Sequence, residues 1–454
     1  MAARLEEQPA GTVTGVYPQG AEREGAYRLL ENGRVDAEAL ERARNLGCAS
    51  RMEELGGVFL VPLDKTSIQL SDREGVRDFG SVGNRRYDKR GVQALTALAL
   101  DAEGAPLGVL YQEMWARGET QSPPRRPGHR SRKRDRDRRP PEARESMRWV
   151  DAMRAAHALA QQHAPSARLW FQLDREGDFW GVHQLVDELG ADATVRMLRN
   201  HVVRDADRRK APLMTWLKEQ PLAAWFQLTL PAHDGRPQRV ARLSLRWGTA
   251  WLRLSLPGGR TRWVSRTFVY VDEPHRPRAH NRIQWLLATT ARVRNVDEAL
   301  RVVDAYKRRW RIEDFHRAWK SGCCNIESSQ LQSLGAFRRW SIFTSSMAAR
   351  AEHIKHYARE YPDAPATLVY TQEEIDAMID WRLCETPKAR TPYKPGDVPR
   401  LTEMTRWVGE LGGYMKSSKA PPPGVVTLSR GLARLGPMVW GRRTRRRRRR
   451  TTSG

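Results

Sequence analysis

Residues 304–322 read DAYKRRWRIEDFHRAWKSG, a short stretch that joins six positive side chains to a single glutamate, Glu313. At the helical rotation of about 100° per residue, one stripe roughly 60° wide collects four polar side chains: Tyr306, Arg309, Glu313 and Lys320. A second stripe is apolar and suits packing on a sheet: Ile312, Phe315 and Trp319. The pattern predicts one long amphipathic helix.

The ends of this helix carry recognisable signals. Asn295 is a suitable N-cap, and Glu298 three residues later completes the pattern of a capping box. Gly322 follows the last helical residues, as a C-terminal stop does. We therefore expect the helix to run from about Val296 to the residues just before Gly322.

Glu313 allows two interpretations. The first is an ordinary surface residue that pairs with Arg309 and Arg317, both four positions away. The second is a metal ligand that works against nucleic acid. The second interpretation needs further carboxylates, because a two-metal phosphoryl-transfer site holds its ions about 4 Å apart with several acidic ligands.

Two further acids follow buried-looking apolar runs. Asp64 ends GVFLVPLD (57–64), and Asp174 ends ARLWFQLD (167–174). Either aspartate alone is explained by turn chemistry at the end of a strand. Two such aspartates together with one helical glutamate favour a metal site, because Mg²⁺ prefers hard oxygen ligands.

The composition points to a polyanionic partner. The chain has 454 residues with 79 Lys and Arg against 53 Asp and Glu, a net charge of +26. No apolar run reaches the ~18 residues of a spanning helix, and MAARLEEQPAGT lacks the apolar core of a secretory signal. Nucleic acid is therefore favoured over a membrane. The cysteines are too few and too badly spaced for a disulfide framework or a zinc site, which favours reduced cytosolic thiols: Cys48, Cys323, Cys324 and Cys384.

The remaining patterns predict an α/β protein. Apolar runs at 92–101 and 108–116 flank a turn at Glu103–Gly104, which indicates antiparallel neighbours. Alternating residues in 221–272 predict a separate β-rich unit of four strands, and 281–290 a further strand. Helical spacing recurs in several segments: 23–46, 145–163, 178–190, 339–357 and 401–415. Residues 117–143 and the tail GRRTRRRRRRTTSG are too rich in charge to bury a core, and we expect them to be disordered.

The spacing Tyr306-x2-Arg309-x3-Glu313-x6-Lys320 resembles the Tyr–Arg–Glu–Lys signature of DDE transposases of the insertion-sequence-four type. LDKTSIQLSD resembles the family's segment around the first catalytic acid, here Asp64, and LDREGDFW the segment around the second, here Asp174. EGAYRLLEN, VLYQEMWAR and RWVGELGGYMKSSKA extend the resemblance over roughly residues 24–430.

The resemblance implies a ribonuclease-H-like catalytic core with a β-rich insertion and a C-terminal helical region. The corresponding boundaries are 1–53 for a shortened helical DNA-binding region, 54–204 and 275–357 for the core, 205–274 for the insertion, 358–440 for the dimerisation region and 441–454 for the Arg-rich tail. A homodimer that acts on double-stranded DNA, both transposon ends and target, is implied as well. The location would be cytoplasmic, at the bacterial nucleoid.

The resemblance also assigns roles to residues. Asp64, Asp174 and Glu313 would bind two Mg²⁺ or Mn²⁺ ions, for nicking, hairpin formation and resolution, and strand transfer. The phosphate contacts would be Tyr306, Arg309 and Lys320, with Arg199 as a further DNA contact. Trp285 would stack near a flipped base, or else belong to the core.

The sequence departs from the family pattern in three places. Little precedes EGAYR, Lys65 stands where threonine is common, and 117–143 and the Arg tail look unlike the family. The short N-terminus motivates an alternative function, an N-terminally shortened DNA-binding or inhibitor form that does not transpose. A structure-specific nuclease would explain the acids without the Tyr–Arg–Glu–Lys spacing.

Overall fold

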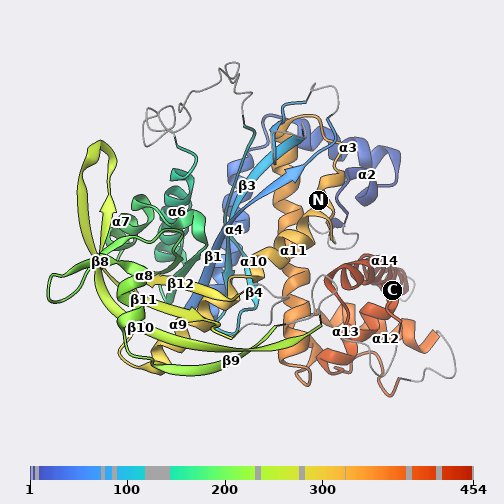
Figure 1. The fold of residues 1–454 in the computed structure, drawn as a ribbon. Coiled ribbons are helices and arrows are strands. Elements are labelled where there is room, and N and C mark those ends of the chain that lie inside the picture. Colours follow the sequence, from blue (N-terminus) through green and yellow to red (C-terminus); the bar gives the residue numbers. More distant parts are fainter. Residues whose placement is uncertain are drawn as a thin grey trace. The chain divides into compact units, whose positions relative to one another are not determined.

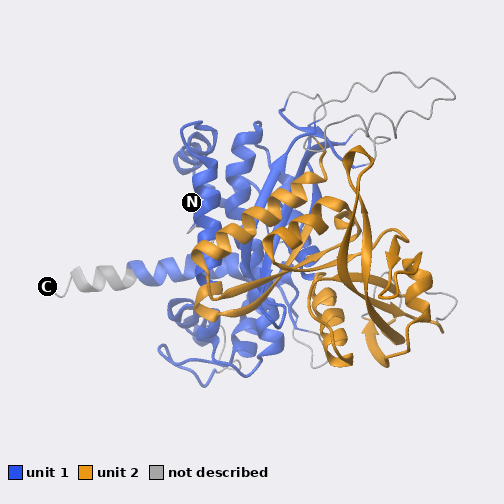
Figure 2. Ribbon diagram, turned by 90° about the vertical axis from the view of Figure 1, so that its left-hand side faces the viewer, with its two compact units in different colours: residues 1–51, 65–121, 311–454 blue, residues 52–64, 122–310 orange. Residues whose placement is uncertain are grey.

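The chain folds into two compact units, each built from several separated segments (Figure 2). Unit 1 comprises Met1–Arg51, Lys65–Gln121 and Arg311–Gly454, and unit 2 comprises Met52–Asp64 and Ser122–Trp310. The computed structural model describes residues 1, 4–5, 10–72, 77–83, 89–117, 144–230, 237–275, 282–322, 324–384, 391–415 and 422–451, without the side chains of 445–451.

Unit 1 contains a small antiparallel sheet beside a long helix. Its strands are β2 (Gly80–Ser81), β3 (Arg90–Leu100), β4 (Pro106–Trp115) and the last part of β1 (Gly57–Gln69), which begins in unit 2. Almost every residue of β3 is buried, as expected of a central strand. Helix α11 (Leu334–Glu360) packs on β4 and also contacts α10 (Arg311–Lys320) and α3 (Gly20–Glu31).

The C-terminal helices of unit 1, coloured from orange to red in Figure 1, share a core of their own. It gathers apolar side chains from the end of α11 through to Val439, with Ile354, Ile379 and Leu428 fully buried. The remaining helices of the unit are α2 (Val13–Val16), α4 (Ala37–Leu55, which continues into unit 2), α12 (Gln372–Cys384), α13 (Leu401–Leu411) and α14 (Val425–Thr451), with short 3₁₀ turns η5 (Ile326–Ser328) and η6 (Ala366–Leu368).

Unit 2 is organised around a mixed sheet. The first part of β1 runs parallel to β5 (Ala167–Leu173), and β5 runs parallel to β6 (Asp192–Arg196). Beyond β6 the order continues antiparallel through β12 (Gln284–Thr289), β11 (Thr261–Asp272) and β10 (Arg239–Ser255). β10 also pairs with β7 (Val202–Arg204) and β9 (Ala224–Leu230), and β7 pairs with β8 (Lys210–Pro212).

Helices and one apolar cluster complete unit 2. Leu252, Phe268 and Leu286, from β10, β11 and β12, are buried in a cluster that Trp216 and Leu217 of α8 (Leu213–Glu219) also join. The other helices are α6 (Met147–His163), α7 (Trp180–Leu189) and α9 (Val296–Arg308), with 3₁₀ turns η3 (Arg175–Gly177) and η4 (Pro257–Gly259).

The predicted α/β class is confirmed, and several elements lie where the sequence placed them. The hairpin β3–β4 is antiparallel, α6 buries its apolar stripe, and α7 ends at Gly190 with a left-handed φ of 61°. Asn295 caps α9, because its side chain accepts a hydrogen bond from the amide of Glu298. The Glu298 carboxylate accepts a hydrogen bond from the amide of Arg294 rather than from that of Asn295.

Other elements differ from the prediction. β10 is one strand of 17 residues rather than two, because Gly248 is not a turn. A Cβ at Gly248 would meet Trp216 Cη2 at 2.8 Å, so the glycine makes room for the α8 tryptophan. The strands expected to form a separate β-rich unit instead continue the sheet of unit 2 through the pairing of β11 with β12. The other predicted domain boundaries stay predictions.

The predicted disordered segments have different outcomes. Residues 118–143 lie outside the described residues. The Arg-rich tail differs from the expectation, since α14 continues to Thr451; arginine is a good helix former. None of the helices in the described part of the chain is both long and apolar enough to cross a membrane.

Candidate active site

Asp64 and Asp174 lie side by side in the sheet of unit 2. The register of β1 and β5 runs from Gly57↔Ala167 to Leu63↔Leu173, so the two aspartates follow at the same level, where the parallel pairing ends. Asp174 ends its strand as predicted. Asp64 does not end its strand, because β1 continues through the next five residues and ends at Gln69. The two carboxylates nevertheless reach one edge of the β1–β5 pair.

The local turn at Asp174 fixes its side chain. Its Oδ1 accepts a hydrogen bond of 2.8 Å from the amide of Glu176, which caps the 3₁₀ turn η3. Both aspartates are half-buried, so they combine a rigid backbone with partial access to solvent. This is the position that a metal-ligating carboxylate requires.

The electrostatics of the aspartate pair favour a cation. The pKa of Asp174 is raised, first by burial and also by the negative charge of Asp64. The amide of Glu176 and the Arg309 guanidinium oppose this rise. A carboxylate whose pKa is raised by a neighbouring carboxylate is also a good oxygen donor for a divalent ion. The donor set of Asp64 and Asp174 therefore fits Mg²⁺ or Mn²⁺.

Two arginines lie near this edge of unit 2. Arg309 is only 6% exposed, and its positive charge acts on both Asp174 and the Tyr306 phenol. Arg196 ends β6 one residue after Val195, the partner of Leu173, so it is level with Asp174. Its Nη2 donates a 3.3 Å hydrogen bond to the Gln284 carbonyl. Sequence analysis missed Arg196, although it follows an apolar strand in the same way as Asp174.

Tyr306 and Trp285 pack on each other rather than standing in solvent. Their rings meet edge to face with centroids 5.9 Å apart, and Tyr306 is 1% exposed. Burial raises the pKa of the Tyr306 phenol. The Tyr306 ring is thus used for packing within unit 2, and its predicted phosphate contact stays a prediction. Trp285 is half-buried, so it is neither a fully buried core residue nor a freely exposed ring.

A buried aspartate holds the loop that carries Arg199. Asp178 Oδ2 accepts hydrogen bonds from the amides of Leu198 (2.7 Å) and Arg199 (3.2 Å), and Oδ1 lies 2.9 Å from His201 Nε2. His183 Nε2 is 3.8 Å from Asp178 Oδ1, too far for a hydrogen bond, and burial lowers the pKa of this imidazole. Burial alone would raise the pKa of Asp178, but these partners hold it well below its usual range. The Arg199 side chain is exposed, as a DNA contact requires.

Glu313 belongs to unit 1, in the first turn of α10. The predicted continuous helix was wrong, because α9 ends at Arg308 and α10 begins at Arg311. At the junction the amides of Arg309 and Trp310 bond to the carbonyls three residues before, a tighter turn than an α-helix. The rotation of 100° per residue therefore does not carry across it, and the predicted polar stripe is divided.

Within α10 the apolar stripe is confirmed. Ile312, Phe315 and Trp319 are fully buried, and Trp319 Nε1 donates a 3.0 Å hydrogen bond to Thr344 Oγ1 of α11. This packing fixes the helix on α11, while Glu313 remains half-buried. Glu313 therefore sits on a rigid helix.

The charged side chains of α10 interact within unit 1. Arg317 pairs with Asp314 at 3.3 Å, and Lys320 Nζ lies 3.4 Å from the Glu327 carboxylate. A phosphate bound by Lys320 would have to compete with Glu327. The structure thus gives Lys320 an acidic partner that the sequence pattern did not indicate.

An acid is also buried behind α10. Glu352 of α11 is 1% exposed and forms an ion pair with Lys355. Burial raises the pKa of Glu352, with a smaller effect of Asp314 in the same direction. Sequence analysis did not single out this residue, since an acid within a helix has no distinguishing pattern.

No complete metal centre forms among the described residues, where no three His, Cys, Asp or Glu side chains are arranged to hold an ion. Asp64 and Asp174 belong to unit 2 and Glu313 to unit 1. Cys48 and Cys324 are buried, and Cys323 lies outside the described residues. Burial raises the pKa of the Cys48 thiol to about 12, which makes it unreactive.

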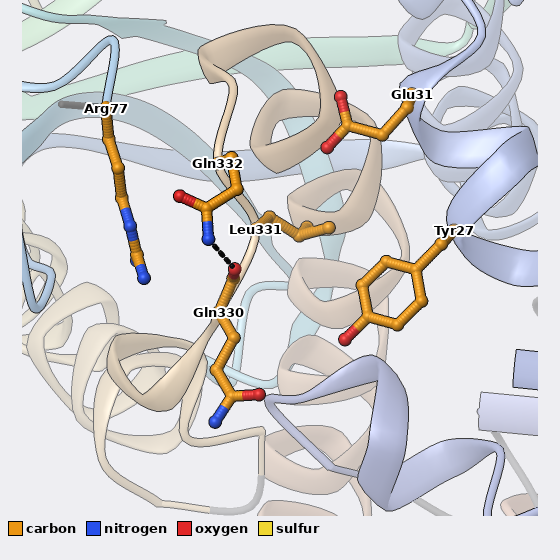
Figure 3. A pocket seen from close by; sticks show the side chains of 6 residues that line it. All are labelled: Tyr27, Glu31, Arg77, Gln330, Leu331 and Gln332. Carbon is orange, nitrogen blue, oxygen red and sulfur yellow. Dashed lines mark hydrogen bonds between the residues drawn. The ribbon is translucent and has the colours of Figure 1, made fainter. Parts of the chain in front are cut away.

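Each unit also contains a cavity. The cavity of unit 1 has a volume of about 430 Å³ and lies between α3, Arg77 and the segment before α11 (Figure 3). Two of its polar side chains have partners, since Glu31 accepts a 2.7 Å hydrogen bond from Ser333 and Gln332 donates one to the Gln330 carbonyl. The cavity of unit 2, about 450 Å³, is lined mainly by hydroxyls and arginines from β10, β11 and the residues after β12.

No protein-family model matches the chain. Its function is therefore argued from the residues and their arrangement.

Proposed function

We propose that the protein is a metal-dependent DNA transposase, with Asp64, Asp174 and Glu313 as its catalytic acids. The observation that carries the proposal is the level placement of Asp64 and Asp174 after Leu63↔Leu173 on neighbouring parallel strands, where burial and mutual repulsion raise the pKa of Asp174. Such a pair is suited to holding a divalent ion against a phosphodiester.

The strand order supports a ribonuclease-H-like core. Within unit 2, β5 and β6 both run parallel to the first part of β1, and within unit 1 β3 and β4 form an antiparallel hairpin. The acids then lie on the central strands of the proposed core, which is the most rigid part of a sheet. The resemblance to DDE transposases supports the same assignment, and extends it to Glu313 and to a homodimer on double-stranded DNA.

The chain's own residues would divide the work as follows. Asp64 and Asp174, with Glu313 from α10, would supply the ligands of Mg²⁺ or Mn²⁺. When bound, such ions lower the pKa of an attacking water or 3′-hydroxyl and stabilise the leaving oxygen. Arg309 and Arg196 lie near the aspartates and would balance the charge of the phosphodiester. Arg199, exposed on a loop that Asp178 holds, would contact DNA beside the site.

The test is Mg²⁺-dependent cleavage of DNA that carries the inverted repeats flanking the gene. We expect the wild-type chain to nick this DNA, and Asp64→Asn, Asp174→Asn and Glu313→Gln each to abolish nicking. Asp151→Asn is the matched control, because Asp151 is an exposed acid of α6. Full activity in any of the first three variants would refute that residue's role. Specific binding to the repeats by a wild-type chain that never cuts would favour the inhibitor function instead.

A further inference from the structure

The far part of the unit 2 sheet has one face that its own core does not cover. Ala250, Leu252 and Leu254 of β10 are buried in the apolar cluster, whereas the residues between them point the other way. Trp251 is 44% exposed, and Arg253 is exposed as well. Large apolar rings are normally buried, so an exposed tryptophan on this face indicates a binding surface.

Cross-strand pairing gathers tryptophan and arginine on this face. Trp251 pairs with Arg204 of β7 on one side and with Ser265 of β11 on the other, and Arg253 pairs with Trp263. The Arg204 guanidinium carbon lies 4.8 Å from the Trp263 ring centroid and 6.0 Å from that of Trp251. We call these four residues the Trp–Arg face: Arg204, Trp251, Arg253 and Trp263.

The positive charge of this face is not neutralised by nearby acids. Neither Arg204 nor Arg253 forms an ion pair with any residue in the described part of the chain, nor does the adjacent exposed Arg262. By contrast, Arg209 and Arg239 of the same region pair with Glu219 and Glu273. The face is therefore complementary to a negatively charged partner.

The 450 Å³ cavity of unit 2 adjoins the same rows of the sheet. Thr249, Ser265 and Thr267 line it, and the first two lie next to Trp251 along and across the strands. On its other side lie Arg292, which is exposed, and Arg294, which pairs with Glu298 at 3.5 Å. The lining also includes Asp187, whose carboxylate is paired with Arg266 at 2.8 Å. The hydroxyls and the exposed Arg292 guanidinium suit a phosphate group.

We propose that the Trp–Arg face and its adjoining cavity bind single-stranded DNA. Two bases would stack on Trp251 and Trp263, which are diagonal neighbours about 7–8 Å apart in the backbone, so that each ring receives its own base. Phosphates would lie against Arg204 and Arg253 and in the hollow beside Arg292. Stacking rings combined with backbone-tracking cations are how single strands are bound without sequence preference.

A single strand fits this face better than a duplex. In a duplex the bases are stacked on each other and cannot reach a tryptophan, so the exposed rings would be left without a partner. An acidic peptide would use the arginines but not the rings. The site is independent of the proposed catalysis, because it uses none of the acids and needs no metal.

The experiment is fluorescence anisotropy of a labelled oligothymidylate with the full chain in EDTA, where cleavage cannot occur. We expect the double variant Trp251→Ala, Trp263→Ala to weaken binding by about tenfold or more, since stacking dominates such sites. Binding to a duplex of matched length should change by less than about twofold. Trp251→Phe, which keeps a ring, should retain most of the affinity.

Trp225→Ala is the matched control. Trp225 is 41% exposed and lies under Arg242, whose guanidinium carbon is 4.7 Å from the ring centroid, but it does not line the cavity. We expect single-strand binding by this variant to stay within about twofold of wild type. Thermal unfolding of each variant checks the fold. If the double variant unfolds, Arg253→Ala replaces it, with an expected loss of a few fold that Trp225→Ala should not show.

Three outcomes would overturn the proposal. They are no loss in the double variant, an equal loss in Trp225→Ala, or a loss that is as large for the duplex as for the single strand. Failure of this proposal is distinguishable from failure of the proposed transposase, because binding in EDTA and cleavage in Mg²⁺ are separate measurements.

Discussion

The acid edge of unit 2 and its Trp–Arg face are two polar sites on one sheet, and they are built in opposite ways. At the acid edge, Asp64 and Asp174 follow apolar runs and are half-buried beside a nearly enclosed Arg309. On the Trp–Arg face, Arg204 and Trp251 are brought together by pairing between β7 and β10. No sequence pattern near either residue predicts that they are neighbours. The first site holds its carboxylates half-buried, and the second carries its arginines at the protein surface.

The two sites tolerate substitution to different extents. A buried charge that loses its partner is costly, because it keeps its desolvation penalty. A half-exposed arginine over a tryptophan contributes little to folding but remains available to a ligand. We therefore expect mutations at the acid edge to affect catalysis and stability together, and mutations on the Trp–Arg face to affect binding alone.

The largest expected effect is a double dissociation between the two sites. Asp64→Asn with Asp174→Asn should remove Mg²⁺-dependent cleavage entirely and leave single-strand binding in EDTA within about twofold of wild type. The double variant Trp251→Ala, Trp263→Ala should instead lose single-strand binding and keep Mg²⁺-dependent cleavage. Cleavage rates and anisotropy on the same preparations make the comparison. If either double variant reduced cleavage and single-strand binding equally, the two sites would not be separate.

The next effect concerns the cations of the two sites. Arg309 favours the ionised form of Asp174, so Arg309→Ala should raise the pKa of that carboxyl further. The acidic limb of the cleavage pH profile should then move to higher pH, by up to about one unit. Arg204→Ala should leave that limb in place. A profile that does not move in Arg309→Ala would show that the guanidinium does not act on Asp174.

Asp178 gives a smaller effect on stability. Its pKa is lower in the folded chain than the value of about 3.9 for a free aspartate. Its stabilising contribution is therefore fully present above about pH 4 and is lost as the pH falls towards the folded pKa. Asp178→Asn should lower the free energy of unfolding at pH 7 by about 1–3 kcal/mol.

Urea unfolding across this pH range measures the effect of Asp178. The gap between wild type and Asp178→Asn should shrink as the solution becomes more acidic than about pH 4. Asp207→Asn serves as the control, since Asp207 is exposed in the loop between β7 and β8. A gap that stays constant with pH would mean that the carboxylate charge of Asp178 is not what stabilises the fold.

The smallest effect is in the salt dependence of single-strand binding. Replacing Arg253 or Arg292 by alanine should reduce the slope of log affinity against log salt by about one for each phosphate that the variant no longer neutralises. The affinity itself should fall only a few fold. Titrations at several salt concentrations measure the slope, and Arg168→Ala, an exposed arginine of β5 that pairs with Asp192, should not change it.

Much of the acid edge was predictable from the sequence, and the reasons are local. An apolar run followed by an acid and a turn indicates a strand end, and Asp174 fits this rule. Asp64 follows the rule only in part, because the next residues also suit a strand and β1 continues to Gln69. The break between α9 and α10 was not predictable, since a single tightened turn at Arg309 does not alter the hydrophobic periodicity of the sequence.

The Trp–Arg face could not be predicted, because it depends on register between distant segments. Arg204 and Trp251 are adjacent only because β10 runs without interruption past Gly248, where sequence patterns place a turn. That glycine reflects the tryptophan of α8 that packs against it rather than a change of direction. Tertiary packing therefore keeps β10 continuous at Gly248, where local propensity predicts a turn between two strands.

The hydrogen bonds of Asp178 have a consequence for Arg199. The amides of Leu198 and Arg199 are fixed on one buried carboxylate, so the backbone under the exposed arginine is ordered before any ligand arrives. The entropy of ordering that loop is lost during folding rather than during recognition. A ligand that meets Arg199 therefore finds a prearranged backbone, and a change at Asp178 should shorten the lifetime of the complex more than it slows its formation.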